Sequence, residues 1–220
     1  MNLKKLAIFS TGITLSVLGL FSARPASAVI LIEDNFDREN NGRFKLNYNN
    51  FQNWNVTEGS VDLIGSNGFP INGRNGKYVD LDGSTGIAGT LESKSVFSFN
   101  TDDTVKLQFV LAGNGRPARD NTSDSVNVSL GSLFSETFTK NPNDPFETIM
   151  RSFTVSSPTD AKLSFDHAGG DRIGLILDDV KLEQVPEPMT ILGSLAALGM
   201  GMLLKKEYSK TKNSPEAKIQ

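Results

Sequence analysis

Apolar and polar residues alternate with a period of two through the middle of this chain, and this alternation limits the folds that it can adopt. Residues 105–111 place apolar side chains at every second position, and residues 126–130 do the same. Successive side chains of a β-strand point to opposite faces, so this period is that of a strand with one buried face. No long stretch of residues 29–184 has the 3.6-residue period of an amphipathic helix. The pattern therefore predicts an all-β domain.

Further segments have the composition of short strands, and turn-rich stretches separate them. The longest break, residues 65–77, contains three Asn-Gly pairs, which favour tight turns. Many short strands with polar turns indicate two sheets packed face to face, a β-sandwich. The further predicted strands are residues 54–57, 60–64, 78–82, 89–93, 96–99, 148–155, 161–165 and 173–182.

The last predicted strand changes phase in its middle. Up to Leu177 its apolar side chains occupy odd positions, and from Val180 onward they occupy even positions. A β-bulge, in which one strand carries an extra residue, would turn both sets inward again. We therefore predict a bulge at Asp178 and Asp179 that swings the two carboxylates outward together.

The first 28 residues have the three parts of a secretion signal. Two lysines precede an apolar run at residues 6–21, and the segment ends in an Ala-Ser-Ala triplet. Ala26 and Ala28 are the small residues that fit a signal peptidase pocket. We therefore expect a signal peptide over residues 1–28, cleavage after Ala28, and signal peptidase as a partner. The alternative is an uncleaved N-terminal anchor.

The other end of the chain carries a short apolar segment. Residues 189–204 are uncharged and are followed by Lys205 and Lys206 and by a polar tail at residues 207–220. Sixteen helical residues span about 24 Å, less than the roughly 30 Å of a bilayer core, so we expect one short C-terminal transmembrane helix. The lysines favour the cytoplasmic side, which places residues 29–184 outside.

A proline-flanked glutamate precedes this helix. Pro186 and Pro188 keep Glu187 in an extended, accessible peptide. The Pro-Glu-Pro motif, the short transmembrane helix and the lysine pair, in this order over residues 185–206, resemble the PEP-CTERM sorting signal of Gram-negative bacteria and cyanobacteria. In that family an exosortase of the inner membrane cuts near the motif. The resemblance implies a sorting motif of Pro186, Glu187 and Pro188 with Lys205 and Lys206, an exosortase partner, transient anchoring in the inner membrane, and a final location at the cell surface or in the extracellular matrix.

The predicted outer domain is acidic and contains no cysteine. Residues 29–187 hold 14 Lys and Arg against 23 Asp and Glu, a net charge of −9, so we expect no nucleic-acid partner. Without cysteine there is no disulfide, thiolate zinc site or cysteine nucleophile. His167 is the only histidine, and no Gly-x-Ser-x-Gly elbow accompanies it. These absences favour a protein that is not an enzyme.

Three motifs in the domain resemble those of galactose-binding-like jelly rolls, which occur in bacterial carbohydrate-binding modules and related surface domains. They are Glu-Asp-Asn-Phe-Asp at residues 33–37, Tyr-Val-Asp-Leu-Asp-Gly at 78–83 and Leu-Asp-Asp-Val-Lys-Leu at 177–182. The resemblance spans most of the domain. It implies an all-β jelly-roll β-sandwich over residues 29–184, in which the first and last strands lie together.

The same resemblance implies a cofactor. In such jelly rolls, carboxylates near the first and last strands often hold a structural calcium ion, and oxygen ligands are those that calcium prefers. It assigns Asp34, Asp37, Asp178 and Asp179 as candidate ligands. The alternative is a solvated acidic edge that discourages aggregation between strands.

Other side chains are candidates for contacts with a ligand. If Val79 and Leu81 point inward, then Tyr78, Asp80 and Asp82 share the opposite face, where they could contact sugar hydroxyls or lie as ordinary surface residues. The stretch from Asp80 to the following serine also matches the start of an EF-hand loop superficially, but the expected glutamate and flanking helices are absent.

A polar loop and a tryptophan complete the candidates. The loop at residues 112–124 carries Arg116 and Arg119, whose guanidinium groups suit acidic sugars or phosphates. The alternative is a solvated connection. Trp54, the only tryptophan, could be a sugar-stacking platform, but its alternation with Val56 favours a place in the core.

Our leading hypothesis is an exported, surface-sorted, non-enzymatic protein that binds or organises extracellular polysaccharide. One alternative is a structural protein of a surface layer or matrix that associates with itself. The other is a secreted glycan hydrolase, in which Asp80 and Asp82 would act as acid and base, although their spacing along one strand gives no reason to expect opposed placement across a bond. The sequence does not identify the ligand or the oligomeric state.

Overall fold

The computed structural model describes residues 27–71, 73–117, 119 and 121–185. Within these residues no helix is long and apolar enough to cross a membrane, and the described helical structure is a 3-10 turn, η1 (Glu39–Gly42). Several predicted features lie outside the described residues and stay predictions. They are the signal peptide through Ala26, the sorting residues Pro186, Glu187, Pro188, Lys205 and Lys206, the transmembrane segment 189–204 and the tail 207–220.

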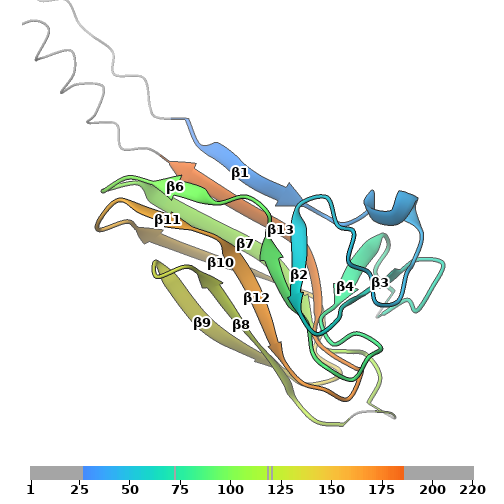
Figure 1. Ribbon diagram of the computed structural model, residues 1–220. Coiled ribbons are helices and arrows are strands. Elements are labelled where there is room, and N and C mark those ends of the chain that lie inside the picture. Colours follow the sequence, from blue (N-terminus) through green and yellow to red (C-terminus); the bar gives the residue numbers. More distant parts are fainter. Residues whose placement is uncertain (1–26, 72, 118, 120, 186–220) are drawn as a thin grey trace, which may run out of the picture. The chain divides into compact units, whose positions relative to one another are not determined.

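The described residues form two antiparallel sheets packed face to face, as the all-β prediction requires (Figure 1). The first sheet runs in the order β10-β7-β13-β4-β3, and β1 also pairs with β13. Its strands are β1 (Val29–Asp34), β3 (Asp62–Gly65), β4 (Lys77–Asp80), β7 (Thr104–Ala112), β10 (Glu147–Thr154) and β13 (Ile176–Val185).

The second sheet runs in the order β2-β5-β12-β8-β9. A separate short pair joins β6 to β11. These strands are β2 (Trp54–Glu58), β5 (Thr90–Ser93), β6 (Phe97–Phe99), β8 (Asp124–Leu130), β9 (Phe134–Lys140), β11 (Thr159–Ala161) and β12 (Leu163–Ala168). The chain passes directly from one large sheet to the other at six of the twelve connections between its described strands, so segments that follow one another often face each other across the core.

The core between the sheets follows the predicted alternation. The apolar side chains of β7 and β8 that were expected to point inward are buried. Phe109 of β7 meets Phe138 and Phe165 of the other sheet edge-on, with ring centroids 5.3 Å and 5.4 Å apart. Each predicted strand overlaps a strand of the structure. β1 and β9 were not among the predicted ranges, and in β9 only the side chain of Phe138 is buried.

The predicted bulge in β13 is confirmed. Leu177 pairs with Leu111 of β7, and the register then shifts between Asp178 and Lys181. Asp179 has a positive φ of 46°, and Leu177 and Val180 both lie in the core. The extra residue increases local twist, so β13 pairs with β4 before the bulge and with β1 after it.

The first and last strands lie together, as expected. β1 pairs with β13 in antiparallel fashion, with Val29 opposite Gln184 and Glu33 opposite Lys181. The start and the end of the described domain therefore leave the fold beside each other (Figure 1).

Trp54 is fully buried, so the prediction of a core position is confirmed. Its indole Nε1 donates a hydrogen bond of 3.0 Å to Oδ2 of Asp34, which also accepts from the side-chain amide of Asn53 at 3.0 Å. Trp54 belongs to the second sheet and Asp34 ends β1 of the first, so this bond connects the two layers.

Replacing Trp54 with phenylalanine keeps an aromatic ring in the core but removes this donor. A lost hydrogen bond to a charged group costs about 1.5 to 3 kcal/mol, so we expect the free energy of unfolding to fall by about that amount. Urea denaturation followed by circular dichroism measures the change, because the variant has no tryptophan left to report by fluorescence. An unchanged midpoint would show that the bond contributes nothing.

Candidate functional site

The outer face of the first sheet is covered over β3 and β4. Part of the predicted turn-rich stretch, residues 65–77, lies on this face and brings Ile71 against Tyr78. The Tyr78 hydroxyl accepts a 2.5 Å hydrogen bond from the backbone N–H of Ile71, and its ring lies 5.6 Å from that of Phe146. Tyr78 is therefore fully buried, and the prediction that it lies on an exposed sugar-contacting face is wrong. The prediction that Val79 and Tyr78 point to opposite faces of β4 was right, but both faces of this strand are covered.

Arg74 fastens this segment to the bulge of β13. Its Nε and Nη2 lie 2.5 Å from Oδ2 of Asp178 and Oδ2 of Asp179, respectively, and its guanidinium lies 4.8 Å from the centre of the Phe146 ring. Burial raises the pKa of Asp178 to about 7, while the bond from Arg74 opposes that rise. The bulge thus presents both carboxylates to one guanidinium, with the side chain of Asp178 5% exposed and that of Asp179 46% exposed.

The four carboxylates that were predicted to hold calcium are divided between separate hydrogen-bonded sites. Asp34 accepts from Asn53 and Trp54, and Asp37 accepts from the backbone N–H of Lys77 at 2.7 Å. Asp178 and Asp179 engage Arg74, as described above. Within residues 27–185, apart from the undescribed positions, no three acidic or histidine side chains are grouped to hold a metal ion. Calcium binding by these residues stays a prediction.

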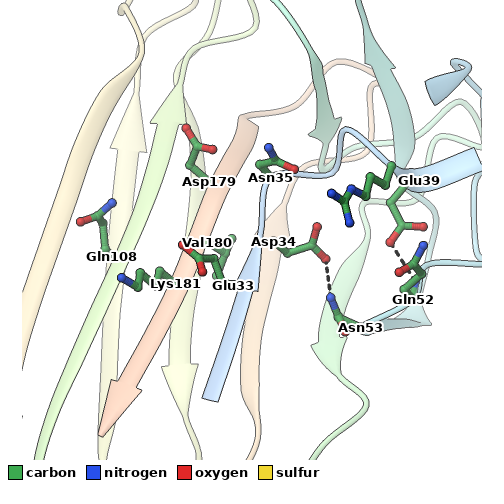
Figure 2. A pocket seen from close by; sticks show the side chains of 11 residues that line it. Glu33, Asp34, Asn35, Glu39, Gln52, Asn53, Gln108, Asp179, Val180 and Lys181 are labelled. Carbon is green, nitrogen blue, oxygen red and sulfur yellow. Dashed lines mark hydrogen bonds between the residues drawn. The ribbon is translucent and has the colours of Figure 1, made fainter. Parts of the chain in front are cut away.

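A hollow of about 510 Å³ opens beside β1 and β13, and we call it the polar groove (Figure 2). It lies between the two strands and the segment that leads into β2. Apart from Val180, its lining residues carry polar side chains. They are Glu33, Asp34, Asn35, Arg38, Glu39, Gln52, Asn53, Gln108, Asp179, Val180 and Lys181.

Part of the polar groove is fixed by hydrogen bonds. Figure 2 shows Asp34 joined to Asn53, and Glu39 joined to Gln52, whose backbone N–H donates at 2.8 Å. Glu39 is buried, and this burial raises its pKa. By contrast, the side chains of Arg38 and Gln108 make no hydrogen bond or ion pair with any other described residue. The groove therefore combines preset acceptors with unengaged donors.

A second hollow, of about 320 Å³, contains both arginines that the sequence analysis singled out, and we call it the arginine pocket. Arg116 and Arg119 are joined there by Arg172, from the loop between β12 and β13, and by the exposed ring of Phe69. Arg172 and Phe69 were not among the predicted site residues, because no local sequence feature links them to the loop at residues 112–124. The full lining is Leu46, Asp62, Ile64, Phe69, Ser84, Arg116, Arg119, Asp171, Arg172 and Ile173.

Asp80 lies beneath this pocket. Its Oδ1 accepts from the backbone N–H of Gly174 at 2.9 Å, and its Oδ2 lies 3.8 Å from Nη1 of Arg116. Burial raises the pKa of Asp80 well above its usual value, and the nearby Arg116 opposes this rise. Asp80 is almost completely buried, so the prediction that its side chain faces a ligand directly is wrong.

Asp82 is buried as well and holds a loop in place. Its Oδ2 accepts three backbone N–H bonds from one turn, those of Gly170, Asp171 and Arg172, at 2.6, 3.0 and 3.2 Å. The predicted exposure of Asp82 is therefore wrong. Its carboxylate positions the residues that line one side of the arginine pocket. Since neither Asp80 nor Asp82 is accessible, this pair has no surface on which to act as the acid and base of a hydrolase.

His167 lies against the same buried carboxylate. Its Nε2 accepts a 3.1 Å hydrogen bond from the backbone N–H of Leu175, so the neutral ring carries its proton on Nδ1. Nδ1 of His167 and Oδ1 of Asp82 are buried and make no hydrogen bond within the described residues. Burial lowers the pKa of His167 to about 4, although the charges of Asp82 and Asp166 oppose the change.

No protein-family model and no curated protein matches this chain. Among solved structures it is similar to the CBM22-1 xylan-binding domain of Xyn10C from Paenibacillus barcinonensis, with 8% identity over 74% of this chain and 99% of that one and a TM-score of 0.44. The K3 adhesin domain of Lys-gingipain from Porphyromonas gingivalis has 13% identity, coverages of 71% and 99%, and a TM-score of 0.42. The C-terminal CBM6 of LamC from Zobellia galactanivorans has 8% identity over 73% of this chain and 100% of that one, with a TM-score of 0.37. Values at this level assign no function to the chain.

Replacing Arg74 with methionine leaves Asp178 buried without its cation. We expect the free energy of unfolding to fall by about 2 to 3 kcal/mol at pH 8, because an unpaired buried carboxylate is costly. The loss should be smaller at pH 5, where Asp178 takes up a proton. Chemical denaturation at the two pH values measures both effects. Arg74→Lys, which keeps the charge but not the two-pronged contact, is the control, and equal losses at both pH values would contradict this account.

His167 should make the protein sensitive to acid. Its pKa is about 6.5 in an unfolded chain and about 4 when folded, so the unfolded state binds the extra proton first. Proton uptake by His167 therefore has no effect on stability at pH 7.5, and it destabilises the folded state by about 2 to 3 kcal/mol at pH 4.5. His167→Gln can still accept from Leu175 without titrating.

The raised pKa values of Asp178 and Glu39 have the opposite effect, because they stabilise the folded state as the pH falls. Both groups are present in the wild type and in the His167→Gln variant, so the difference in stability between the two proteins isolates the effect of the histidine. We expect the stability of His167→Gln relative to wild type to improve by that amount between pH 7.5 and pH 4.5. Denaturation curves at several pH values provide the measurement. A constant difference across this range would show that His167 is not buried in its neutral form.

Proposed function

We propose that this domain binds extracellular polysaccharide in the polar groove and does not break it down. The observation that carries the proposal is the groove itself, an open hollow whose walls are almost entirely hydrogen-bonding side chains. A sugar hydroxyl both donates and accepts, so a wall that mixes carboxylates with amides and basic groups can satisfy it. Glu33 and Asp34 supply acceptors, while Arg38 and Gln108 supply donors, and Lys181 adds a positive charge that is paired with Glu183.

The rigidity of the groove supports this proposal. Asp34 is held by Asn53, and the buried Glu39 holds the backbone of Gln52, so the wall of the groove needs little ordering when a ligand arrives. An open groove also lets a long chain lie through it without threading an end. The buried state of Asp80 and Asp82 supports the non-enzymatic part of the proposal, because these were the carboxylates considered for hydrolysis.

The placement of the protein at the cell surface is part of the same proposal. It is supported by the signal-like residues 1–28 and by the Pro-Glu-Pro motif, transmembrane segment and lysine pair of residues 186–206. A structural calcium ion bound through Asp34, Asp37, Asp178 or Asp179 would be compatible with saccharide binding. It is not required for the contacts described for the polar groove.

The test is co-sedimentation of the purified protein with exopolysaccharide from the strain that produces it. We expect Arg38→Gln and Gln108→Ala each to weaken binding, the first by about tenfold, since a hydrogen bond from a charged group is worth more than a neutral one. Arg43→Gln is the matched control, because Arg43 is exposed and does not line the groove. Absence of binding to exopolysaccharide and to a panel of other glycans would overturn the proposal.

A further inference from the structure

We propose that the arginine pocket binds the anionic group of an acidic sugar, an inference that rests on the proposed polysaccharide-binding function and specifies its substrate class. Three of the seven arginines between residues 29 and 185 line this single hollow.

The described lining of the pocket contains more positive than negative side chains. The side chains of Arg119 and Arg172 have no carboxylate partner among the described residues. The pocket also contains Asp62 and Asp171, so its lining carries three positive and two negative side chains, and both carboxylates are held by neutral hydrogen-bond donors rather than by the arginines. Asp62 accepts from Ser84 and from the backbone N–H of Asn47, and Asp171 accepts from the backbone N–H of Ile173.

Arg116 has only a long contact with a carboxyl group. Its Nη1 lies 3.8 Å from Oδ2 of Asp80, beyond hydrogen-bond distance. Burial raises the pKa of Asp80, Arg116 opposes that rise, and no hydrogen bond joins the two groups. An incoming carboxylate or sulfate can therefore bind this guanidinium without displacing a strong ion pair. A guanidinium fork matches such groups geometrically.

The pocket also offers an apolar surface, which a simple anion would not need. Phe69 is 49% exposed and Phe44 is 42% exposed, and their rings meet edge-on with centroids 6.0 Å apart. The guanidinium of Arg116 lies 5.7 Å from the centre of the Phe69 ring. A sugar ring has an apolar C–H face that can pack on such an aromatic surface while its acidic group reaches the arginines.

The backbone around the pocket holds these side chains in place at some cost. Phe69 and Arg172 have positive φ values of 57° and 77°, a region that bulky residues rarely adopt. Gly68 permits the aromatic pair, because a Cβ at this position would lie 2.3 Å from the Phe44 ring. Asp82 fixes the turn that carries Arg172. The site is thus maintained by contacts from three separate segments.

The charge of the rest of the domain makes this pocket selective. With a net charge of −9 over residues 29–187, the domain repels polyanions in general. Binding of an acidic polymer therefore needs a local positive site, and raised ionic strength should weaken it. This separates the pocket from the polar groove, which needs no charge on its ligand.

Calorimetry with the full-length purified protein tests the inference directly. The probes are trigalacturonate, its methyl ester, a sulfated maltotriose and triglutamate. We expect the anionic sugars to bind at least about tenfold more tightly than the methyl ester and triglutamate, because a hydrogen bond to a charged group is lost in the ester and the ring contact is lost in the peptide. The two anionic sugars distinguish a carboxylate from a sulfate ester as the natural group.

Two variants locate the binding. Arg116→Gln and Arg172→Asn should each weaken binding of the anionic sugar by about tenfold or more. Asparagine tolerates the positive φ of Arg172, so that variant should keep the thermal midpoint of the wild type. Arg151→Gln is the control, since it changes the net charge equally at an arginine that pairs with Glu136 outside the pocket.

The outcomes separate this inference from the proposed function. Equal binding of trigalacturonate and its methyl ester, equal binding of triglutamate, or unchanged affinity in both arginine-pocket variants would overturn the inference. If exopolysaccharide is still retained in an Arg38-dependent manner, the proposed function stands without it. If the anionic trisaccharide binds through Arg116 but no polysaccharide is retained, the pocket assignment stands and the polysaccharide function fails.

Discussion

The extra residue in β13 is the constraint on which both hollows depend. The bulge turns Asp178 and Asp179 toward Arg74, and Arg74 holds residues 66–76 over β4. That segment carries Phe69 to the edge of the arginine pocket. Beyond the bulge, the redirected strand supplies Val180 and Lys181 to the polar groove. One insertion in a central strand thus shapes the sheet's outer surface on both sides.

Features that depend on the periodic pattern of one strand could be predicted from the sequence. Features that depend on contacts between segments far apart in the chain could not. Alternation located the strands, and the change of phase at Leu177 located the bulge, because both follow from the geometry of a single strand. The burial of Tyr78 and Asp82 could not be predicted from the geometry of a single strand. Tyr78 is covered by a loop whose path depends on Arg74, and Asp82 by a turn almost ninety residues later in the chain. The positive φ values of Phe69 and Arg172 also leave no mark in composition.

Buried and half-buried carboxylates act here as supports for neighbouring segments. Asp34 connects the two sheets through Trp54, Asp82 fixes a turn through three backbone N–H groups, and Asp80 accepts from Gly174 beneath Arg116. Hydrogen bonding of this kind offsets the cost of removing a polar group from water. Acidic motifs that look like ligand sites in a sequence can therefore serve to position neighbouring turns and strands.

The pairing of β1 with β13 also determines how the domain carries load. A protein held through the chain beyond Val185, while a polymer pulls on the body of the sandwich, transmits the force along β13. The hydrogen bonds that join β13 to β7 and β1 run across that direction, so they are strained in shear and resist together rather than opening one after another. The strand that shapes the two hollows is thus also the one that best resists force applied along its length.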